Sequence, residues 1–188
     1  VLSRENKIAS IPLSLTLGDE LQILVENEGR INYGIANDFK GIVGTVTYNS
    51  MILLNWTMTG YPLDDYKKIQ DLVMGLKRKY GSNQRSQVSV KSYLRSGATL
   101  FHGEFNLKAN EIGDTYLDPT TWGKGILFIN GFNLGRYWPL VGPQITLYVP
   151  REILRSGVNS ISMIELEKSP ENGKVTFSAT PNLDGNFF

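Results

Sequence analysis

The stretch GILFINGFNLGRYW, residues 125–138, decides the fold of this chain. Asn130-Gly131 separates two apolar runs, and Asn-Gly is the pair that most readily takes positive φ at both centres of a two-residue hairpin turn. In the first run, ILFI, successive side chains point to opposite faces, and both faces are apolar. A strand that is apolar on both faces lies between two layers or beneath a neighbouring domain, so we expect a hairpin whose first strand is covered on both faces.

The same stretch ends in a cluster that allows two interpretations. Gly135 permits a β-bulge or a close approach of the backbone, and Arg136 can stack on its aromatic neighbours or hold a carboxylate. Tyr137 and Trp138 either cap the core or form a platform for a sugar ring. With Trp122, the triplet Arg136, Tyr137 and Trp138 gives our candidates for contact with a sugar or with a neighbouring domain.

Further short runs with strand periodicity surround the hairpin. No strand–helix–strand alternation accompanies them, so we expect an all-β sandwich of antiparallel strands over residues 93–188, rather than a parallel sheet. The runs are ATLFHGEFNL (98–107), GKGILFI (123–129), FNLGRYW (132–138), PQITLYVP (143–150), SISMIELE (160–167) and KVTFSAT (174–180).

The N-terminal third also shows strand periodicity, in residues 11–17, 21–25 and 42–48. These strands are too few for a sandwich of their own, so residues 1–61 are predicted to pair with strands from elsewhere. Residues 63–80 instead repeat apolar side chains at three- and four-residue steps, which predicts one amphipathic helix. That helix and a polar linker form a connector over residues 62–92.

Composition excludes several classes of function. Lys and Arg total 19 against 18 Asp and Glu, a net charge of +1, so no long-range field favours nucleic acid or an acidic membrane. The chain has no cysteine and one histidine, His102, so we expect no disulfide, no metal site built from Cys or several His, and no cofactor. Whether a calcium or other cation binds is left open by the sequence. No apolar run reaches the roughly 20 residues that cross a bilayer.

The start of the chain bears on its origin. It begins without Met and lacks a secretory signal pattern, as expected of a processed or excised segment. Asn55-Trp56-Thr57 is a sequon, which makes Asn55 a candidate N-glycosylation site if the chain enters the secretory route.

The sequence offers few residues suited to catalyse hydrolysis. Glycoside hydrolysis uses two flanking carboxylates. Glu165 and Glu167 share one face of a predicted strand, where simple solvation is the usual outcome, so we assign no catalytic residue. His102 falls in an alternating strand, where a packed or hydrogen-bonded imidazole is expected.

Two longer stretches resemble a known family. TWGKGILFINGFNLGRYWPLVGPQITLYVPREIL (121–154), followed by NSISMIELE (159–167), closely resembles the C-terminal region of the glycoside hydrolase family 35 β-galactosidases of the animal lysosomal type. LVENEGRINYGIANDFKGIVGTV (24–46) is similar to a strand pair in their preceding β-domain. The resemblance implies a catalytic (β/α) barrel followed by two galactose-binding-like jelly rolls, of which this chain holds the later part of the first and all of the second.

The resemblance also implies a function. Enzymes of this family are retaining glycosidases that remove terminal non-reducing β-D-galactose from glycoconjugates, using two glutamates of the barrel. No position here matches those glutamates, so the chain is expected to be the non-catalytic C-terminal part of such an enzyme. The implied partners are the barrel of the same or a processed parent chain, galactosides, and a second copy of the parent enzyme, in a lysosomal or secreted setting. The alternatives are a stand-alone carbohydrate-binding module and a purely structural association module.

Overall fold

A computed structural model shows how the chain is built. The chain divides into two compact units, Leu2–Tyr61 and Pro62–Phe188. The described residues are 2–3, 6–26, 29, 33–34, 39–64, 66–80, 91–92 and 98–185, with backbone only at 66, 76, 77, 79, 80, 91 and 92.

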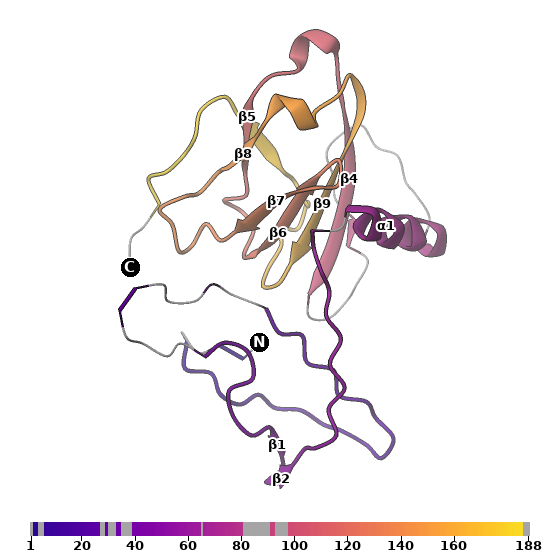
Figure 1. Cartoon of the computed structure of the whole chain (residues 1–188), viewed down its shortest axis with the longest axis vertical. Coiled ribbons are helices and arrows are strands. Elements are labelled where there is room, and N and C mark those ends of the chain that lie inside the picture. The colour runs from indigo at the N-terminus through magenta and orange to yellow at the C-terminus, as the bar shows by residue number, and fades with distance from the viewer. Residues whose placement is uncertain are drawn as a thin grey trace. The chain divides into compact units, whose positions relative to one another are not determined.

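The second unit contains two antiparallel sheets (Figure 1). The larger has the order β3-β4-β9-β6-β7. The smaller has the order β10-β5-β8. The strands are β3 (Lys91–Ser92), β4 (Thr99–Leu107), β5 (Thr115–Asp118), β6 (Gly125–Ile129), β7 (Phe132–Tyr137), β8 (Leu147–Val149), β9 (Gly157–Glu165) and β10 (Thr176–Ser178), with 3-10 turns at Ala109–Glu111 and Arg151–Ile153.

The core lies between these two sheets. Side chains of both sheets form one apolar cluster, in which the Phe101 ring meets Trp122 edge to face with centroids 4.9 Å apart. Each fully buried aliphatic side chain contributes about 1.5–3 kcal/mol to stability. The cluster comprises Phe101, Leu117, Trp122, Leu127, Ile129, Tyr137, Leu147, Val149, Ile161, Met163 and Val175. The predicted all-β sandwich is therefore confirmed.

The predicted hairpin forms as expected. Asn130 and Gly131 have φ of 52° and 85°, as a two-residue turn with positive φ at both centres requires. The β6–β7 register shifts opposite Leu134, and Gly135 beside it has φ of 103°, so the glycine serves a bulge and not a close approach. Both faces of β6 are used, since Leu127 belongs to the core while Phe128, only 1% exposed, faces the other side.

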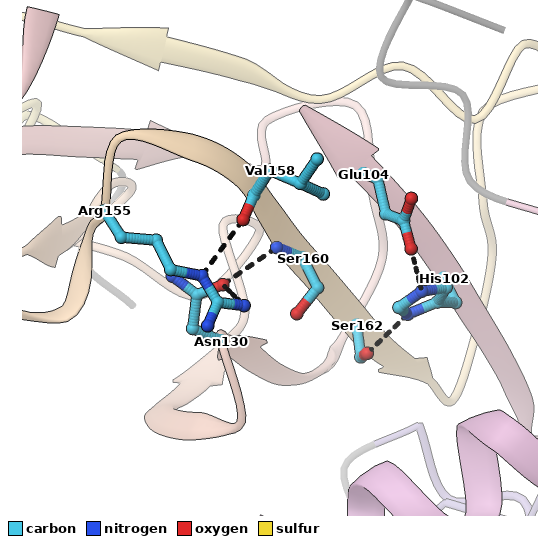
Figure 2. Close-up of polar contacts among 7 residues, drawn as sticks. All are labelled: His102, Glu104, Asn130, Arg155, Val158, Ser160 and Ser162. Atoms are coloured by element: carbon cyan, nitrogen blue, oxygen red, sulfur yellow. Dashed lines mark hydrogen bonds and ion pairs between the residues drawn. The ribbon is translucent and has the colours of Figure 1, made fainter. Parts of the chain in front are cut away.

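The predicted helix is α1, Tyr66–Tyr80, with Ile69 and Val73 buried as its periodicity indicated. It lies beside β4 in both views (Figures 1 and 2). Leu100 of β4 is buried as well and points away from the inter-sheet core, so the outer face of the larger sheet is partly covered. The side chains predicted on the same helix face at 66, 76 and 80 lie outside the described residues.

Two strands of the second unit depart from the sequence prediction. β5 is the middle strand of the smaller sheet, yet its four residues are flanked by Asp, Gly and Pro and gave no periodic signal. β3 forms at Lys91–Ser92, inside the predicted linker, because β4 offers an open edge that two polar residues can pair with. Partner strands, not local propensity, create both elements.

The first unit contradicts the strand prediction for residues 11–17 and 21–25. Over its described residues it has only β1 (Thr47–Tyr48), β2 (Met51–Ile52) and a bridge between Ser3 and Ile8. A strand needs a neighbouring strand that pairs with its backbone N–H and C=O groups, and no described segment forms such a ladder with residues 11–17 or 21–25. The backbone N–H of Leu15 donates to the Tyr48 hydroxyl instead, at 3.1 Å. Most apolar side chains of these two segments consequently stay exposed, with Leu24 at 61% and Leu17 fully in solvent.

Candidate functional site

The end of β7 and the segment before β8 enclose a pocket of about 230 Å³. Residues 136–138 form one wall, and Val141, Gly142, Gln144, Ile145 and Leu147 form the other. We call it the Trp138 pocket. The lining combines aliphatic side chains and aromatic rings with one guanidinium and one amide, the mixture of apolar walls and few polar groups typical of ligand sites.

Three of the four sequence candidates meet in this pocket. Arg136 is exposed, Trp138 is half-buried, and Tyr137 is 1% exposed with its ring in the core cluster. Trp122 is not among the lining residues, because it is fully buried and its indole N–H donates to the carbonyl of Lys174 at 3.0 Å. Trp122 is thus a core residue, while Arg136 and Trp138 remain candidates for an outside contact.

The cation over Trp138 is a residue that the sequence prediction did not name. Lys124 places its Nζ 3.8 Å from the Trp138 ring centroid, and its side chain is buried. A cation over an indole face is attracted by the ring quadrupole, about 2 kcal/mol when desolvated. Lys124 therefore fixes the ring and occupies one of its two faces.

The C-terminal segment holds the far wall of the pocket. The backbone N–H of Ile145 donates to the carbonyl of Asn182 at 3.0 Å, and that of Gly185 donates to the carbonyl of Pro143 at 2.9 Å. A Cβ on Gly185 would lie 2.9 Å from the carbonyl oxygen of Pro143 and 3.0 Å from Cα of Gly142, so this close backbone approach favours glycine. The pocket is consequently preorganised by backbone contacts on both sides.

Behind Tyr137, a buried carboxylate is held in what we call the carboxylate cradle. Glu165 is 3% exposed and accepts five hydrogen bonds of 2.8–3.1 Å. Oε1 accepts from the backbone of Lys124, Glu167 and Lys168, and Oε2 accepts from the backbone of Gly123 and from the Tyr137 hydroxyl. A carboxylate has about four lone-pair sites, so this one has no capacity left for a substrate.

The cradle corrects the prediction that Glu165 and Glu167 share an exposed strand face. β9 ends at Glu165, which turns into the protein, while Glu167 lies beyond the strand and is exposed. Burial is tolerated because the surrounding N–H groups replace water. Burial and the adjacent carboxylate raise the pKa of Tyr137 above its ordinary value, so the phenol stays protonated and donates.

His102 is buried and hydrogen-bonded, as predicted (Figure 2). Its Nδ1 lies 3.0 Å from Oγ of Ser162, its partner on β9, and its Nε2 lies 3.8 Å from Oε1 of Glu104. Serine, histidine and glutamate in this order superficially match a hydrolase triad. The hydroxyl cannot act on a substrate, however, because Ser162 and His102 are only 6% and 8% exposed.

A second polar network fixes the hairpin tip (Figure 2). Asn130 Oδ1 accepts from the backbone of Ser160 at 2.9 Å and from Arg155 at 3.3 Å, and Arg155 Nε donates to the carbonyl of Val158. Asn130 also donates to Oδ1 of Asn159, which is fully buried. These bonds stay within the sandwich, so this network is structural.

The described residues contain no group of three or more His, Cys, Asp or Glu placed to hold a metal ion. Within the same part of the chain, no helix combines the length and apolar character that a membrane span needs.

The geometry first defines the class of the protein. The second unit is a β-sandwich whose buried carboxylate and histidine serve its own architecture, with the Trp138 pocket at its edge.

Comparison with known proteins gives the family. Residues 98–159 match the family model "Beta-galactosidase, galactose-binding domain", and residues 1–64 match "Beta-galactosidase, first all-beta domain". Together the two matches cover more than half of the chain, which belongs to the β-galactosidase family.

Individual relatives agree with this assignment. The chain is 39% identical over 165 residues to β-galactosidase 17 of Arabidopsis thaliana, covering 86% of this chain and 24% of that protein. It is 38% identical over 175 residues to the β-galactosidase of Homo sapiens, covering 90% and 25%, and 40% identical over 178 residues to that of Bos taurus, covering 90% and 26%. The chain spans about a quarter of the length of the curated relatives it matches. These matches support a part of a β-galactosidase rather than a stand-alone module.

Proposed function

We propose that this chain supplies the non-catalytic C-terminal β-domains of a retaining β-galactosidase that removes terminal non-reducing β-D-galactose from glycoconjugates. In this role it packs against the catalytic (β/α) barrel, in the same or a processed parent chain. The family matches in both units, each to a β-domain of β-galactosidases, are the observation that carries the proposal.

The chemistry of the described residues supports a non-catalytic role. Among the described residues, the buried carboxylate is that of Glu165, and hydrogen bonds from the protein itself fill its acceptor sites. A general acid or nucleophile of a glycosidase must instead face the scissile bond. The catalytic glutamates are therefore assigned to the barrel and not to this chain.

The exposed apolar side chains of the first unit support the partner. Leu54 is 74% exposed, Met58 93% and Tyr61 72%, which is unusual for an isolated soluble unit. A neighbouring domain that buries them would supply the missing core. Pairing of the parent enzyme into a homodimer belongs to the same proposal and is tested by the mass of the native enzyme.

The test uses the protein in its source. An antibody against the peptide FNLGRYWP (132–139) is used to deplete an extract, and activity on a chromogenic β-galactoside is measured before and after. We expect the activity to follow the depleted protein, whose mass should exceed 21.0 kDa several-fold. Antibody blocked with free peptide is the control. Hydrolysis by the purified 188-residue chain, or full activity left in the depleted extract, would contradict the proposal.

A secretory route, lysosomal or extracellular, is part of the proposal and rests on the sequon. Asn55 and Thr57 are both exposed, so an oligosaccharide can be accommodated there. Treatment of the native protein with an N-glycosidase should lower its mass and convert Asn55 to Asp. In a secretory host, Thr57→Ala should abolish that mass change and Thr57→Ser should keep it. An unmodified Asn55 in the native protein would argue against this part.

A further inference from the structure

The chain contains two Asn-Gly pairs, Asn130-Gly131 in the β6–β7 hairpin and Asn172-Gly173 in the turn before β10. Asn-Gly is the dipeptide most prone to spontaneous deamidation, because glycine has no side chain to hinder its own backbone nitrogen. We propose that Asn172 is a modification site, at which the side-chain amide converts spontaneously to isoaspartate, while its contacts protect Asn130 from the same reaction. This inference does not rest on the proposed function.

The reaction is an intramolecular substitution at the side chain of Asn172. The backbone nitrogen of Gly173 attacks Cγ, its proton passes to the departing amide, and the Cγ–Nδ2 bond breaks to release ammonia. The product is a five-membered succinimide. Water then adds to one of its two carbonyls and breaks one C–N bond, which gives aspartate or, where the chain continues through the side-chain carboxyl, isoaspartate. Water is the co-reactant, and nothing is oxidised or reduced.

The turn at Asn172 exposes the amide and favours attack on it. Asn172 is exposed, and its Oδ1 accepts a hydrogen bond from the backbone N–H of Lys174 at 3.0 Å. That N–H stabilises the negative charge that develops on Oδ1 when Cγ is attacked. The leaving nitrogen, Nδ2, donates no hydrogen bond to any residue that the structure describes.

One contact at this turn opposes the reaction. The backbone N–H of Gly173 donates to the carbonyl of Pro170 at 3.0 Å, and this bond must open before the nitrogen can attack. Glu171 and Asn172, the two residues between them, are both exposed. A single hydrogen bond that closes an exposed turn opens far more often than the packed core does.

Asn130 has the same neighbouring glycine in the opposite environment. Its Nδ2 donates to the carbonyl of Ile153 at 2.7 Å and to Oδ1 of Asn159 at 2.8 Å. Its Oδ1 accepts from the backbone of Ser160 and from Arg155 (Figure 2). Release of Nδ2 breaks the two bonds that it donates, and the two that Oδ1 accepts hold the amide against rotation toward the next backbone nitrogen. Asn130 therefore reacts only when the hairpin opens.

Isoaspartate at position 172 acts on the core through Trp122. The modification adds one atom to the backbone path, so the residues that follow it shift. Two residues later, the carbonyl of Lys174 accepts the indole N–H of Trp122 at 3.0 Å, and Val175 belongs to the core cluster. Aspartate at the same position adds the charge without lengthening the backbone. Isoaspartate is therefore expected to displace the hydrogen-bond acceptor of a fully buried tryptophan, and aspartate is not.

The first experiment compares the two pairs within one molecule. The 188-residue chain is incubated at mildly alkaline pH, folded or unfolded in urea, then digested at acidic pH and analysed by mass spectrometry. Labelling with an isoaspartate methyltransferase distinguishes isoaspartate from aspartate. In the folded chain we expect Asn172 to convert at least about tenfold faster than Asn130, because Asn130 must first lose four hydrogen bonds. In urea the two rates should be similar, since glycine follows both.

The second experiment measures the effect on Trp122 by NMR of its indole N–H. The signal is assigned with Trp56→Phe and Trp138→Phe. Aged protein should show a second Trp122 signal that grows with the isoaspartate content. Asn172→Asp is the matched control, because it carries the charge on an unaltered backbone and should keep the original signal. Asn172→Gln should stop the conversion, since its longer side chain would have to close a six-membered ring.

Three outcomes would overturn the inference. If Asn172 converted no faster than Asn130 in the folded chain, the contrast between the two turns would be wrong. If folding slowed Asn172 as much as Asn130, the bond from Gly173 to Pro170 would be protective. An unchanged Trp122 signal in fully converted protein, or the same shift in Asn172→Asp, would contradict the effect of the added backbone atom. None of these results involves galactoside hydrolysis, so the proposed function keeps its own test.

Discussion

The two units of this chain carry similar sequence patterns and reach different degrees of order. In the sandwich unit, alternating apolar residues of β4, β6 and β9 meet the smaller sheet and become buried. In the N-terminal unit, residues 11–17 alternate just as clearly, yet Ile11, Leu13 and Leu17 stay exposed. The difference is the presence of a partner, since a pleated strand gains little until its neighbour covers one face and pairs its backbone.

The substitution with the largest expected effect on stability is at Gly125, where β6 approaches Ile164 and Tyr137 closely. In Gly125→Ala, the added Cβ would lie 2.0 Å from the carbonyl oxygen of Ile164 and 2.5 Å from the Tyr137 hydroxyl. Because backbone cannot move aside cheaply, we expect a loss of more than about 4 kcal/mol in the free energy of unfolding.

Urea denaturation followed by near-UV circular dichroism measures this loss. Gly113→Ala is the control, because a Cβ there meets nothing within 4 Å and the predicted cost is below about 1 kcal/mol. Equal stability of the two variants would show that the cradle region is less tightly packed than described.

A matched pair of leucines tests the comparison directly. Leu127 is 0% exposed, so Leu127→Ala should cost about 2–5 kcal/mol, whereas Leu17 is fully exposed and Leu17→Ala should change stability by less than about 0.5 kcal/mol. Thermal unfolding of both variants gives the two numbers. A cost for Leu17→Ala near that of Leu127→Ala would mean that the N-terminal unit has a core in the isolated chain.

The third expected effect concerns the carboxylate cradle. Glu165→Gln replaces an acceptor oxygen by an NH₂ group that faces backbone N–H donors, and unsatisfied buried donors cost about 1–3 kcal/mol. We expect a loss of about 2–3 kcal/mol, measured by the same denaturation experiment. Glu167→Gln, two residues away and exposed, should stay within about 0.5 kcal/mol of the wild type. If Glu165→Gln left the free energy of unfolding unchanged, the five hydrogen bonds would contribute no net stability.

The smallest expected effect depends on pH. A hydrogen bond from the backbone of Arg151, together with one from the Tyr148 hydroxyl, lowers the pKa of Asp114. A lowered folded-state pKa means that the contribution is present above the unfolded pKa, about 3.9, and lost as pH falls through the folded value. Asp114→Asn should therefore melt slightly below the wild type at pH 7 and together with it at the lowest pH. If the difference in melting temperature persisted at low pH, the lost stability would come from packing and not from the charge of Asp114.

The sequence predicted what depends on local chemistry. Asn130-Gly131 determined the hairpin turn, the apolar residues on both sides of β6 indicated an interior strand, and helical spacing gave α1. Arg136 and Trp138 were chosen as candidates because aromatic and guanidinium groups are adjacent in the sequence, and both line the Trp138 pocket. Their contact with a sugar or a neighbouring domain stays a prediction.

Long-range structure accounts for what the sequence did not predict. Glu165 was predicted to be solvated because its partners Gly123, Lys124 and Tyr137 are about 30–40 residues away, and nothing near it in sequence indicates burial. β5 is four residues long and exists only between two partner strands. Lys124 gave no signal, because its contact with Trp138 follows from the pairing of β6 with β7.

The order of strands in the larger sheet has a consequence for biosynthesis. β9, near the end of the chain, pairs with both β4 and β6 and so lies at the centre of the sheet. As the ribosome extends the chain at about 5–20 residues per second, β4 and β6 must wait several seconds with open edges before β9 emerges. A message truncated before residue 157 would yield a polypeptide with no sheet centre, which quality control would have to remove.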